Sequence, residues 1–406
     1  MTTTIIIALC SLLLVAYLFD LTFAKTKIPS VILLLLLGWV VRQATVFFEV
    51  QLPNFSSVLP VLGTIGLILI VLEGSLELEL NRSKLGLIRK SFIGALLSMF
   101  ALAFLLAYVF QHFGGSSLKD SLTNAIPLCI VSSAIAIPSV RNLTSSDKEF
   151  IIYESSLSDI LGVLFFNFVA LNTQFGFHSF GHFALQLLIM IVVSFVATIG
   201  LSFLLNNIEH HIKFIPITLL VILIYAISKV YHLPALLFIM LFGLFIGNLD
   251  ELRRFKWIEK FRPTELNKEV AKFKELTVEA AFLIRSLFFL LFGYLLETAE
   301  ILNTQTLLWS AGIVVAIFIF RIIQLKLSSL PLKSLLFVAP RGLITILLFL
   351  SIDPSQSISL VNNSLIIQVI IMTALIMMLG LMMTGKPAEE QPAIAKPEQP
   401  AEQLEA

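Results

Sequence analysis

Charged side chains are scarce in this sequence of 406 residues: Lys, Arg, Asp and Glu make up 13% of it, against 58% hydrophobic residues. Soluble domains carry about a quarter charged residues, so this composition excludes a soluble protein and indicates helices that pack against lipid and one another. The basic residues lie in short loops, which argues against nucleic-acid binding. The two cysteines, Cys10 and Cys129, lie in apolar segments, so no disulfide framework is expected.

The motifs of common catalytic chemistry are also missing. The sequence shows no metal-ligand spacing of His and Cys, no glycine-rich nucleotide loop and no nucleophile–base set. We therefore expect neither an enzyme nor an ATP-driven pump, and no cofactor.

Apolar segments dominate what is present. Thirteen of them are long enough to cross a hydrocarbon core of about 30 Å, so the sequence predicts an all-α polytopic membrane protein with about 13 transmembrane helices. Their expected limits are 3–23, 28–46, 58–79, 91–113, 121–141, 148–172, 182–205, 212–230, 232–249, 275–296, 305–325, 332–352 and 362–384.

Basic residues alternate between the loops. They gather after the first, third, fifth, seventh, ninth and eleventh segments and are nearly missing from the loops between. The excess of Lys and Arg in cytoplasmic loops then places the N-terminus outside and the C-terminus in the cytoplasm, with the chain in the plasma (inner) membrane.

The chain divides into four expected parts. Residues 1–249 form an N-terminal half, 250–274 a cytoplasmic amphipathic linker, 275–385 a C-terminal half, and 386–406 a disordered tail rich in Pro, Glu and Ala. Segment 121–141 holds Pro127 and Pro138, and segment 332–352 holds Pro340-Arg341-Gly342, so both are expected to be broken helices. Broken helices in corresponding places of two halves indicate inverted repeats that cross at the membrane midplane.

Two acidic residues fall inside the segment 148–172. A charge at bilayer depth costs about 2.5–3.5 kcal/mol, so Asp159, near the segment's centre, is expected to be functional. Glu154 lies about 140° around the helix from Asp159, and Ser155 shares the face of Asp159. Carboxylate and hydroxyl oxygens suit a hard cation, so Asp159, Glu154, Ser155 and the neighbouring Ser158 are the candidate cation and proton site.

A third acidic residue, Glu73, needs a buried cation. The candidates are Arg285, Arg321 and Arg341, each in a different apolar segment. An Arg beside a helix break can instead neutralise the negative helix end that the break creates.

Four stretches resemble the NhaP-type and NHE-type sodium/proton antiporters, over most of the chain. Glu154-Ser155-Ser156-Leu157-Ser158-Asp159 resembles their Glu-Ser-x-x-Asn-Asp signature, and Leu72-Glu73-Gly74 opens a segment similar to their Phe-Glu-Gly-Gly-Leu-x-Leu-Asp. The helix that begins Arg285-Ser286-Leu287 resembles their Asn-Ser-Leu-x-Phe-x-x-Ile-Gly, and Ala339-Pro340-Arg341-Gly342 resembles their Gly-Leu-Arg-Gly.

The resemblance implies an NhaA-like antiporter fold, a homodimer, and elevator-like exchange of Na⁺ or Li⁺ for protons. It makes Asp159, Glu154 and Ser155 the cation ligands, and it favours Arg321 as the partner of Glu73. The family's Thr-Asp-Pro is here Ala136-Ile137-Pro138, without the Asp, and Ser132-Ser133-Ala134-Ile135-Ala136 is closer to the Ser-Ser-Thr-Ala-Ile pattern of Kef-type potassium/proton systems.

Three functions remain open. The first is a monovalent cation/proton antiporter, with one exchangeable carboxylate and hence an electroneutral 1:1 cycle. The second is a Kef-like potassium efflux system, and the third is a non-transporting membrane sensor that keeps the fold. The partners under the first function are Na⁺ or Li⁺, or K⁺, with protons, the lipid bilayer and a second copy of the chain.

Overall fold

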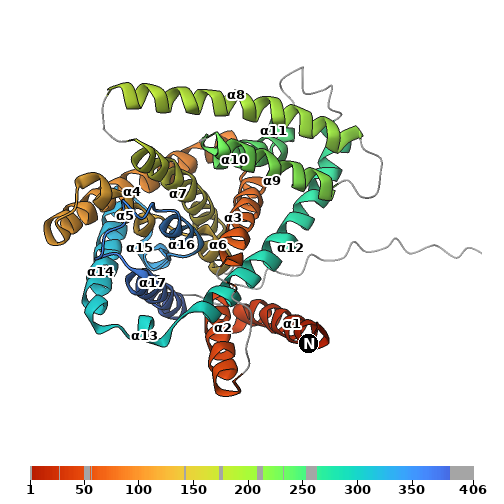
Figure 1. Ribbon diagram of the computed structural model, residues 1–406. Helices are drawn as coiled ribbons and strands as arrows, with labels where there is room; N and C mark the ends of the chain where they lie inside the picture. Colours follow the sequence, from red (N-terminus) through yellow and green to blue (C-terminus); the bar gives the residue numbers. More distant parts are fainter. Residues whose placement is uncertain are drawn as a thin grey trace, which may run out of the picture.

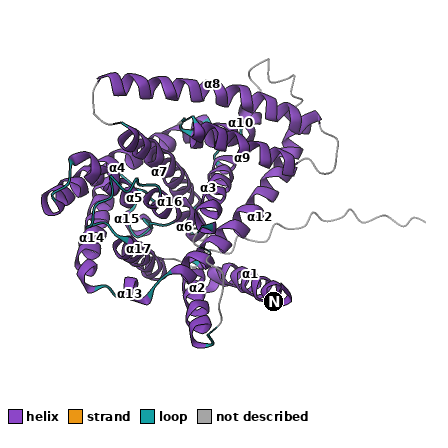
Figure 2. Ribbon diagram, in the orientation of Figure 1, coloured by secondary structure: helices purple, strands orange, loops and turns teal. Residues whose placement is uncertain are grey.

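The computed structural model describes residues 2–26, 28–49, 55, 57–140, 143–172, 177–207, 214–231, 233–252 and 263–384, and the regular structure in these ranges is helical (Figures 1 and 2). The helices are α1 (Thr2–Thr26), α2 (Ser30–Phe47), α3 (Val58–Glu77), η1 (Arg82–Lys84), α4 (Leu85–Gly114), α5 (Leu118–Cys129), α6 (Ser133–Ser139), α7 (Ser145–Leu171), α8 (Phe177–Asn207), α9 (Phe214–Val230), α10 (Ala235–Gly247), α11 (Leu249–Leu252), α12 (Pro263–Leu295), α13 (Thr298–Ile301), α14 (Thr304–Leu327), α15 (Leu332–Leu335), α16 (Leu343–Leu350) and α17 (Asn363–Thr384).

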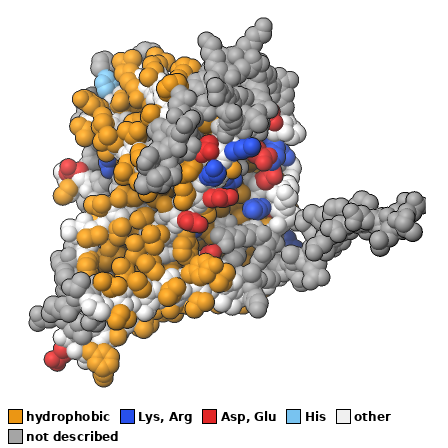
Figure 3. All heavy atoms as spheres, turned by 90° about the vertical axis from the view of Figure 1, so that its right-hand side faces the viewer, with side chains coloured by type: hydrophobic (Ala, Val, Ile, Leu, Met, Phe, Trp, Pro, Cys, Tyr) orange, Lys and Arg blue, Asp and Glu red, His pale blue; other side chains and the backbone are white. Residues whose placement is uncertain are grey.

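The prediction of a multi-span membrane protein is confirmed. Within the described ranges eight helical segments are long and apolar enough to cross a bilayer, and three shorter apolar helices accompany them. Hydrophobic side chains cover a broad part of the face in Figure 3, where Lys, Arg, Asp and Glu gather towards one edge. Such a surface matches lipid on its apolar part and water on its charged part.

Both broken segments are observed. The first splits into α5 and α6, with residues 130–132 outside either helix, and the second splits into α15 and α16 around residues 336–342. The expected linker at 250–274 lies partly outside the described residues. Its described second part is continuous with the next spanning segment, because α12 runs unbroken from Pro263 to Leu295. The expected tail, 386–406, also lies outside the described residues.

The helices pack as two bundles, and each bundle contains helices from both expected halves of the sequence. In the "α12 bundle", α12 packs on α1, α2, α3 and α8, and α10 packs on α3, α8 and α9. In the "α7 bundle", α4 packs on α5, α7 and α14, α7 on α5 and α6, α14 on α15 and α17, and α16 on α5. The bundles meet mainly where α3 contacts α6, α7 and α16.

The α12 bundle is held by close backbone contact between α2 and α12. A Cβ on Gly38 would lie 2.7 Å from the backbone nitrogen of Tyr294, and one on Gly293 would lie 2.9 Å from the Cα of Leu35. Only glycine allows two helices to approach so closely, and membrane helices associate through such small residues.

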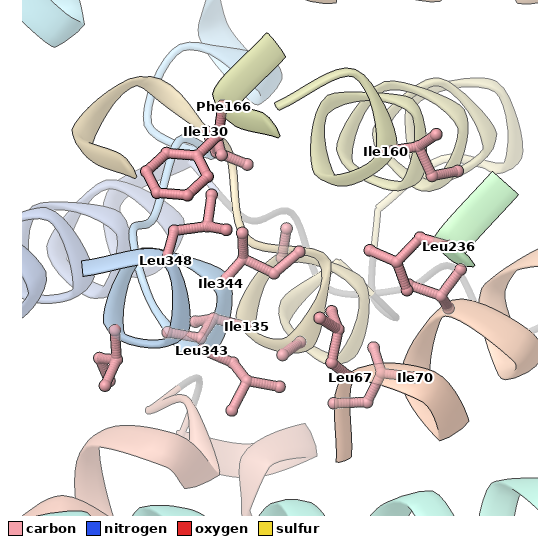
Figure 4. Close-up of a cluster of buried hydrophobic side chains, with 14 of the residues drawn as sticks. Leu67, Ile70, Ile130, Ile135, Ile160, Phe166, Leu236, Leu343, Ile344 and Leu348 are labelled. Carbon is pink, nitrogen blue, oxygen red and sulfur yellow. The ribbon is translucent and has the colours of Figure 1, made fainter. Parts of the chain in front are cut away.

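The contact between the bundles is apolar. Figure 4 shows a cluster of buried side chains where α3 and α10 of one bundle face α6, α7 and α16 of the other. Its members include Leu67, Ile70, Ile135, Ile160, Phe166, Leu236, Leu343, Ile344 and Leu348. Aliphatic contacts of this kind exclude water and involve no directional hydrogen bonds.

Candidate functional site

The two broken segments touch at their breaks. The backbone nitrogen of Ser132 donates to the carbonyl of Pro340 over 2.9 Å, which joins the α5–α6 break to the α15–α16 break. Gly342 makes this contact possible, because a Cβ there would lie 2.9 Å from Ser132 Oγ and 3.2 Å from Ile135 Cγ1. The breaks leave backbone groups without helical partners inside the membrane, so side chains must satisfy them.

Asp159 is bound to the first residue of α6. Its Oδ2 accepts a hydrogen bond from the Ser133 backbone nitrogen over 3.3 Å and a short one from the Ser133 hydroxyl. Asp159 is only 1% exposed, and among the described residues its second oxygen, Oδ1, has no hydrogen-bond partner. A buried carboxylate with one oxygen held and the other unpaired can take up a proton or a cation.

The serines beside Asp159 differ in what they contact. Ser158 Oγ accepts from the Val131 backbone nitrogen over 3.0 Å, so it satisfies the break, and Ser155 donates to the Ile151 carbonyl of its own helix over 2.7 Å. Ser156 lies on the face of Asp159, three residues before it, and its hydroxyl has no partner in the described part of the chain. A Cβ on Gly74 of α3 would lie 3.0 Å from Ser156 Oγ, so this hydroxyl faces the other bundle.

Arg341 lies at the C-terminal end of α5, across the break from the start of α6 that Asp159 contacts. Its Nε donates to the Leu128 carbonyl at the end of α5 over 2.6 Å, and its Nη1 donates to the Ala339 carbonyl over 2.9 Å. A positive charge thus lies at the negative end of α5 while Asp159 lies at the positive end of α6, and both arrangements are favourable. This is the helix-break role expected for an Arg at this position.

Glu154 pairs with Arg321, and both are almost fully buried. Arg321 Nη1 and Gln324 Nε2 each donate a short hydrogen bond to Glu154 Oε1, and Arg321 Nε donates to the Leu335 carbonyl over 3.2 Å. A small cavity of about 20 Å³ borders Glu154, Arg321 and Arg341, which is room for about one water molecule. The pair therefore joins α7, α14 and α15 within one bundle.

The predicted pairing of Glu73 with Arg321 is wrong. Arg285 Nη1 lies 4.0 Å from Glu73 Oε2, whereas Arg321 contacts Glu154. Packing is the reason, because α3 packs on α12, which carries Arg285, while α14 packs in the α7 bundle.

Two cavities lie between the bundles, at opposite ends of α3 and α7. One, of about 200 Å³, is lined by Glu77, Glu79, Lys84, Glu149 and Tyr153 among others. Lys84 contacts Glu79 at 2.6 Å and Glu149 at 3.0 Å, and the hydrogen bond that Lys84 Nζ donates to Glu79 raises the pKa of Lys84 above its usual value.

The other cavity, of about 360 Å³, lies at the far end of α3 and α7. Its walls include four side chains of the apolar cluster in Figure 4, namely Leu67, Phe166, Leu236 and Leu348.

The sequence brought Asp159, Glu154, Ser155 and Ser158 together as one site, but the structure separates them into two environments. Ser133 and Gln324 are contacts of these acids that the predicted site did not include. For Ser133, the sequence does offer a signal: the serine pair at 132–133 lies next to a break flanked by prolines. Gln324 offers none, since it becomes a partner only through packing of α14.

Comparisons with known proteins identify the family and the fold. The family described as "Sodium/hydrogen exchanger, transmembrane" matches residues 9–386. The chain belongs to this family. Its fold is that of the sodium proton antiporter MjNhaP1 from Methanocaldococcus jannaschii. The structure of that antiporter at pH 8 shares 18% identity with a TM-score of 0.66, covering 95% of this chain and 100% of the other.

A second structure of the same antiporter, from electron microscopy, gives 18% identity and a TM-score of 0.67 over 94% and 95% of the two chains. No curated protein matches the chain. Family and fold together support cation/proton antiport by a multi-span membrane transporter. The family resemblance seen in the sequence is thus confirmed. Asp159, beside the α5–α6 break, is the centre of the candidate ion site.

Proposed function

We propose that the chain exchanges one monovalent cation for one proton across the plasma membrane, with Asp159 as the carboxylate that carries either. The main support for this proposal is the contact of Asp159 with Ser133. One carboxylate oxygen is fixed at the helix break, and the other has no partner in the described residues. Na⁺ or Li⁺ is the first candidate, since hard carboxylate and hydroxyl oxygens suit small cations. Ser156, on the same face, is a further oxygen for the site.

The arrangement of the bundles supports alternating access by sliding. Asp159 belongs to the α7 bundle, and the apolar cluster in Figure 4 lies between it and the α12 bundle. Movement of the α7 bundle past α3 would carry Asp159 from one cavity towards the other. The apolar side chains that line the 360 Å³ cavity would then act as the seal on that side.

The distribution of basic loops supports a topology with the N-terminus outside and the C-terminus in the cytoplasm. The cavity lined by Glu77, Glu79 and Glu149 then faces the cytoplasm. A homodimer, formed through the α12 bundle, would leave the α7 bundle free to move.

Potassium is the second candidate cation. The contact of Ser133 with Asp159 favours it, because this serine belongs to the segment that resembles Kef-type systems. Charge balance is the same for either cation.

Proton flux into proteoliposomes, driven by Na⁺, Li⁺ or K⁺ gradients, tests the proposal. We expect flux with at least one of these cations, no flux in Asp159→Asn, and unchanged flux in Asp147→Asn, which alters a carboxylate in the first turn of the same helix. Normal flux in Asp159→Asn would refute the role of Asp159, and no flux in the wild-type protein would favour a sensor. A rate that depends on an imposed membrane potential would contradict 1:1 exchange.

A further inference from the structure

A large apolar groove lies between α2, the turn around α13, and α17. Its volume is about 510 Å³, which is within the range of ligand-binding pockets. One wall is a single face of α2, made by residues spaced at three, four and seven positions: Ile32, Leu35, Leu36 and Trp39. The opposite wall is a matching face of α17, made by Ile371, Ala374 and Leu375.

The groove opens towards the lipid. Leu35 and Ala374 form its floor and are 6% and 1% exposed, whereas Leu36 and Leu375 at its rim are 53% and 38% exposed. Leu379, one turn further along α17, is also 53% exposed, so the rim continues into the apolar surface of the spanning helices. An apolar cavity does not hold water, and the surrounding hydrocarbon is the apolar material that can fill it.

Polar groups that are already paired lie at one end of the groove. Trp39 Nε1 donates to Thr298 Oγ1 over 3.1 Å. Arg42 forms an ion pair with Glu297 at 3.1 Å and donates to the Leu295 carbonyl over 2.9 Å. The charge of Arg42 is thus neutralised, so nothing at this end selects a lipid head group by charge.

From these observations we infer that the groove binds one acyl chain of a membrane glycerophospholipid. The stretch from Ile32 to Trp39 spans about 10 Å along the helix, which fits within one leaflet of a hydrocarbon core about 30 Å thick. The paired state of Arg42 means that chains of zwitterionic and anionic lipids bind equally well.

A lipid bound in the groove would also affect the rate of exchange, an inference that rests on the proposed sliding of the bundles. Its α2 wall belongs to the α12 bundle and its α17 wall to the α7 bundle. A chain seated there must shift whenever the bundles move, so occupancy of the groove and the rate of exchange are coupled.

Native mass spectrometry of the purified full chain tests the site. The probes are phosphatidylcholine and phosphatidylglycerol with identical chains, and a free fatty acid of the same length. We expect one phospholipid per chain with either head group, and at least a tenfold loss of occupancy in Ala374→Phe, which fills the floor. Met383→Phe, on the same helix beyond the groove and its rim, should leave occupancy unchanged.

Two further measurements keep the test decisive. If Ala374→Phe does not fold, Leu36→Phe narrows the groove from its exposed rim and adds no tryptophan. In a chain with Trp257→Phe and Trp309→Phe, phospholipid with brominated chains should quench Trp39 fluorescence, and the groove-filling change should remove most of that quenching.

Equal occupancy and quenching in wild type and groove-filled variants would overturn the inference, as would binding of the fatty acid but not of phospholipid. These readouts require no transport. If lipid is lost from Ala374→Phe while its exchange rate stays normal, the acyl-chain site stands and the sliding of the bundles is refuted.

Discussion

The Glu154–Arg321 pair offers the sharpest test of the site's energetics. Both side chains are at most 2% exposed, and Glu154 also accepts from Gln324. Glu154→Gln leaves Arg321 as an uncompensated buried charge, and Arg321→Met does the same to Glu154. Removing one partner of such a pair typically costs about 3–5 kcal/mol.

The double variant, Glu154→Gln with Arg321→Met, should cost far less than the sum of the two single changes. We expect a coupling free energy of at least about 2 kcal/mol, because both charges are then gone and neither is stranded. The free energy of unfolding would be measured by titration with a denaturing detergent in mixed micelles, for all four proteins under one set of conditions.

The pair of Lys84 and Glu79 is a matched control at the surface. Its 2.6 Å contact is close, but the two side chains are 24% and 66% exposed, so the coupling should be at most about 1 kcal/mol. Equal coupling in the two pairs, or simple addition of the losses from Glu154→Gln and Arg321→Met, would refute the reasoning.

Three further outcomes follow from particular contacts. Gly342→Ala should lower the free energy of unfolding by about 1–3 kcal/mol, because the new Cβ would meet Ser132 where the broken helices cross. Gly312→Ala, whose Cβ would have nothing within 4 Å, should be neutral or slightly stabilising. Equal melting temperatures for the two variants would contradict this. A double-mutant cycle of Glu73→Gln and Arg285→Met should show coupling, and simple additivity would show that they are not partners. The raised pKa of Lys84 means that its pairing stabilises the protein below pH 10.5 and that this contribution disappears as pH rises through the higher folded pKa. The stability difference between wild type and Lys84→Met should follow that course, and a difference that persists above this pKa would argue against the ion pair as its source.

The sequence by itself determined the membrane fold. The length of each apolar segment is a local property set by bilayer thickness, so thirteen expected spans correspond to single or broken helices in the structure. The breaks at 130–132 and 336–342 were also predictable, since they lie near Pro127, Pro138 and the stretch Pro340-Arg341-Gly342. Asp159 stood out for a similar reason, because a charge in an apolar segment is costly wherever the helix packs.

The tertiary structure decided which charges meet. Glu154 and Arg321 are 167 residues apart, and no local pattern records that α14 packs on α4 with Arg321 reaching Glu154 of α7, while α12 packs beside α3. The angle of about 140° between Glu154 and Asp159 allows them different neighbours, but the sequence placed both in one site, and only packing gave one to Arg321 and the other to Ser133. Buried polar groups take whichever partner the packed helices bring within reach, so side-chain pairing follows the arrangement of helices and not their order in the chain.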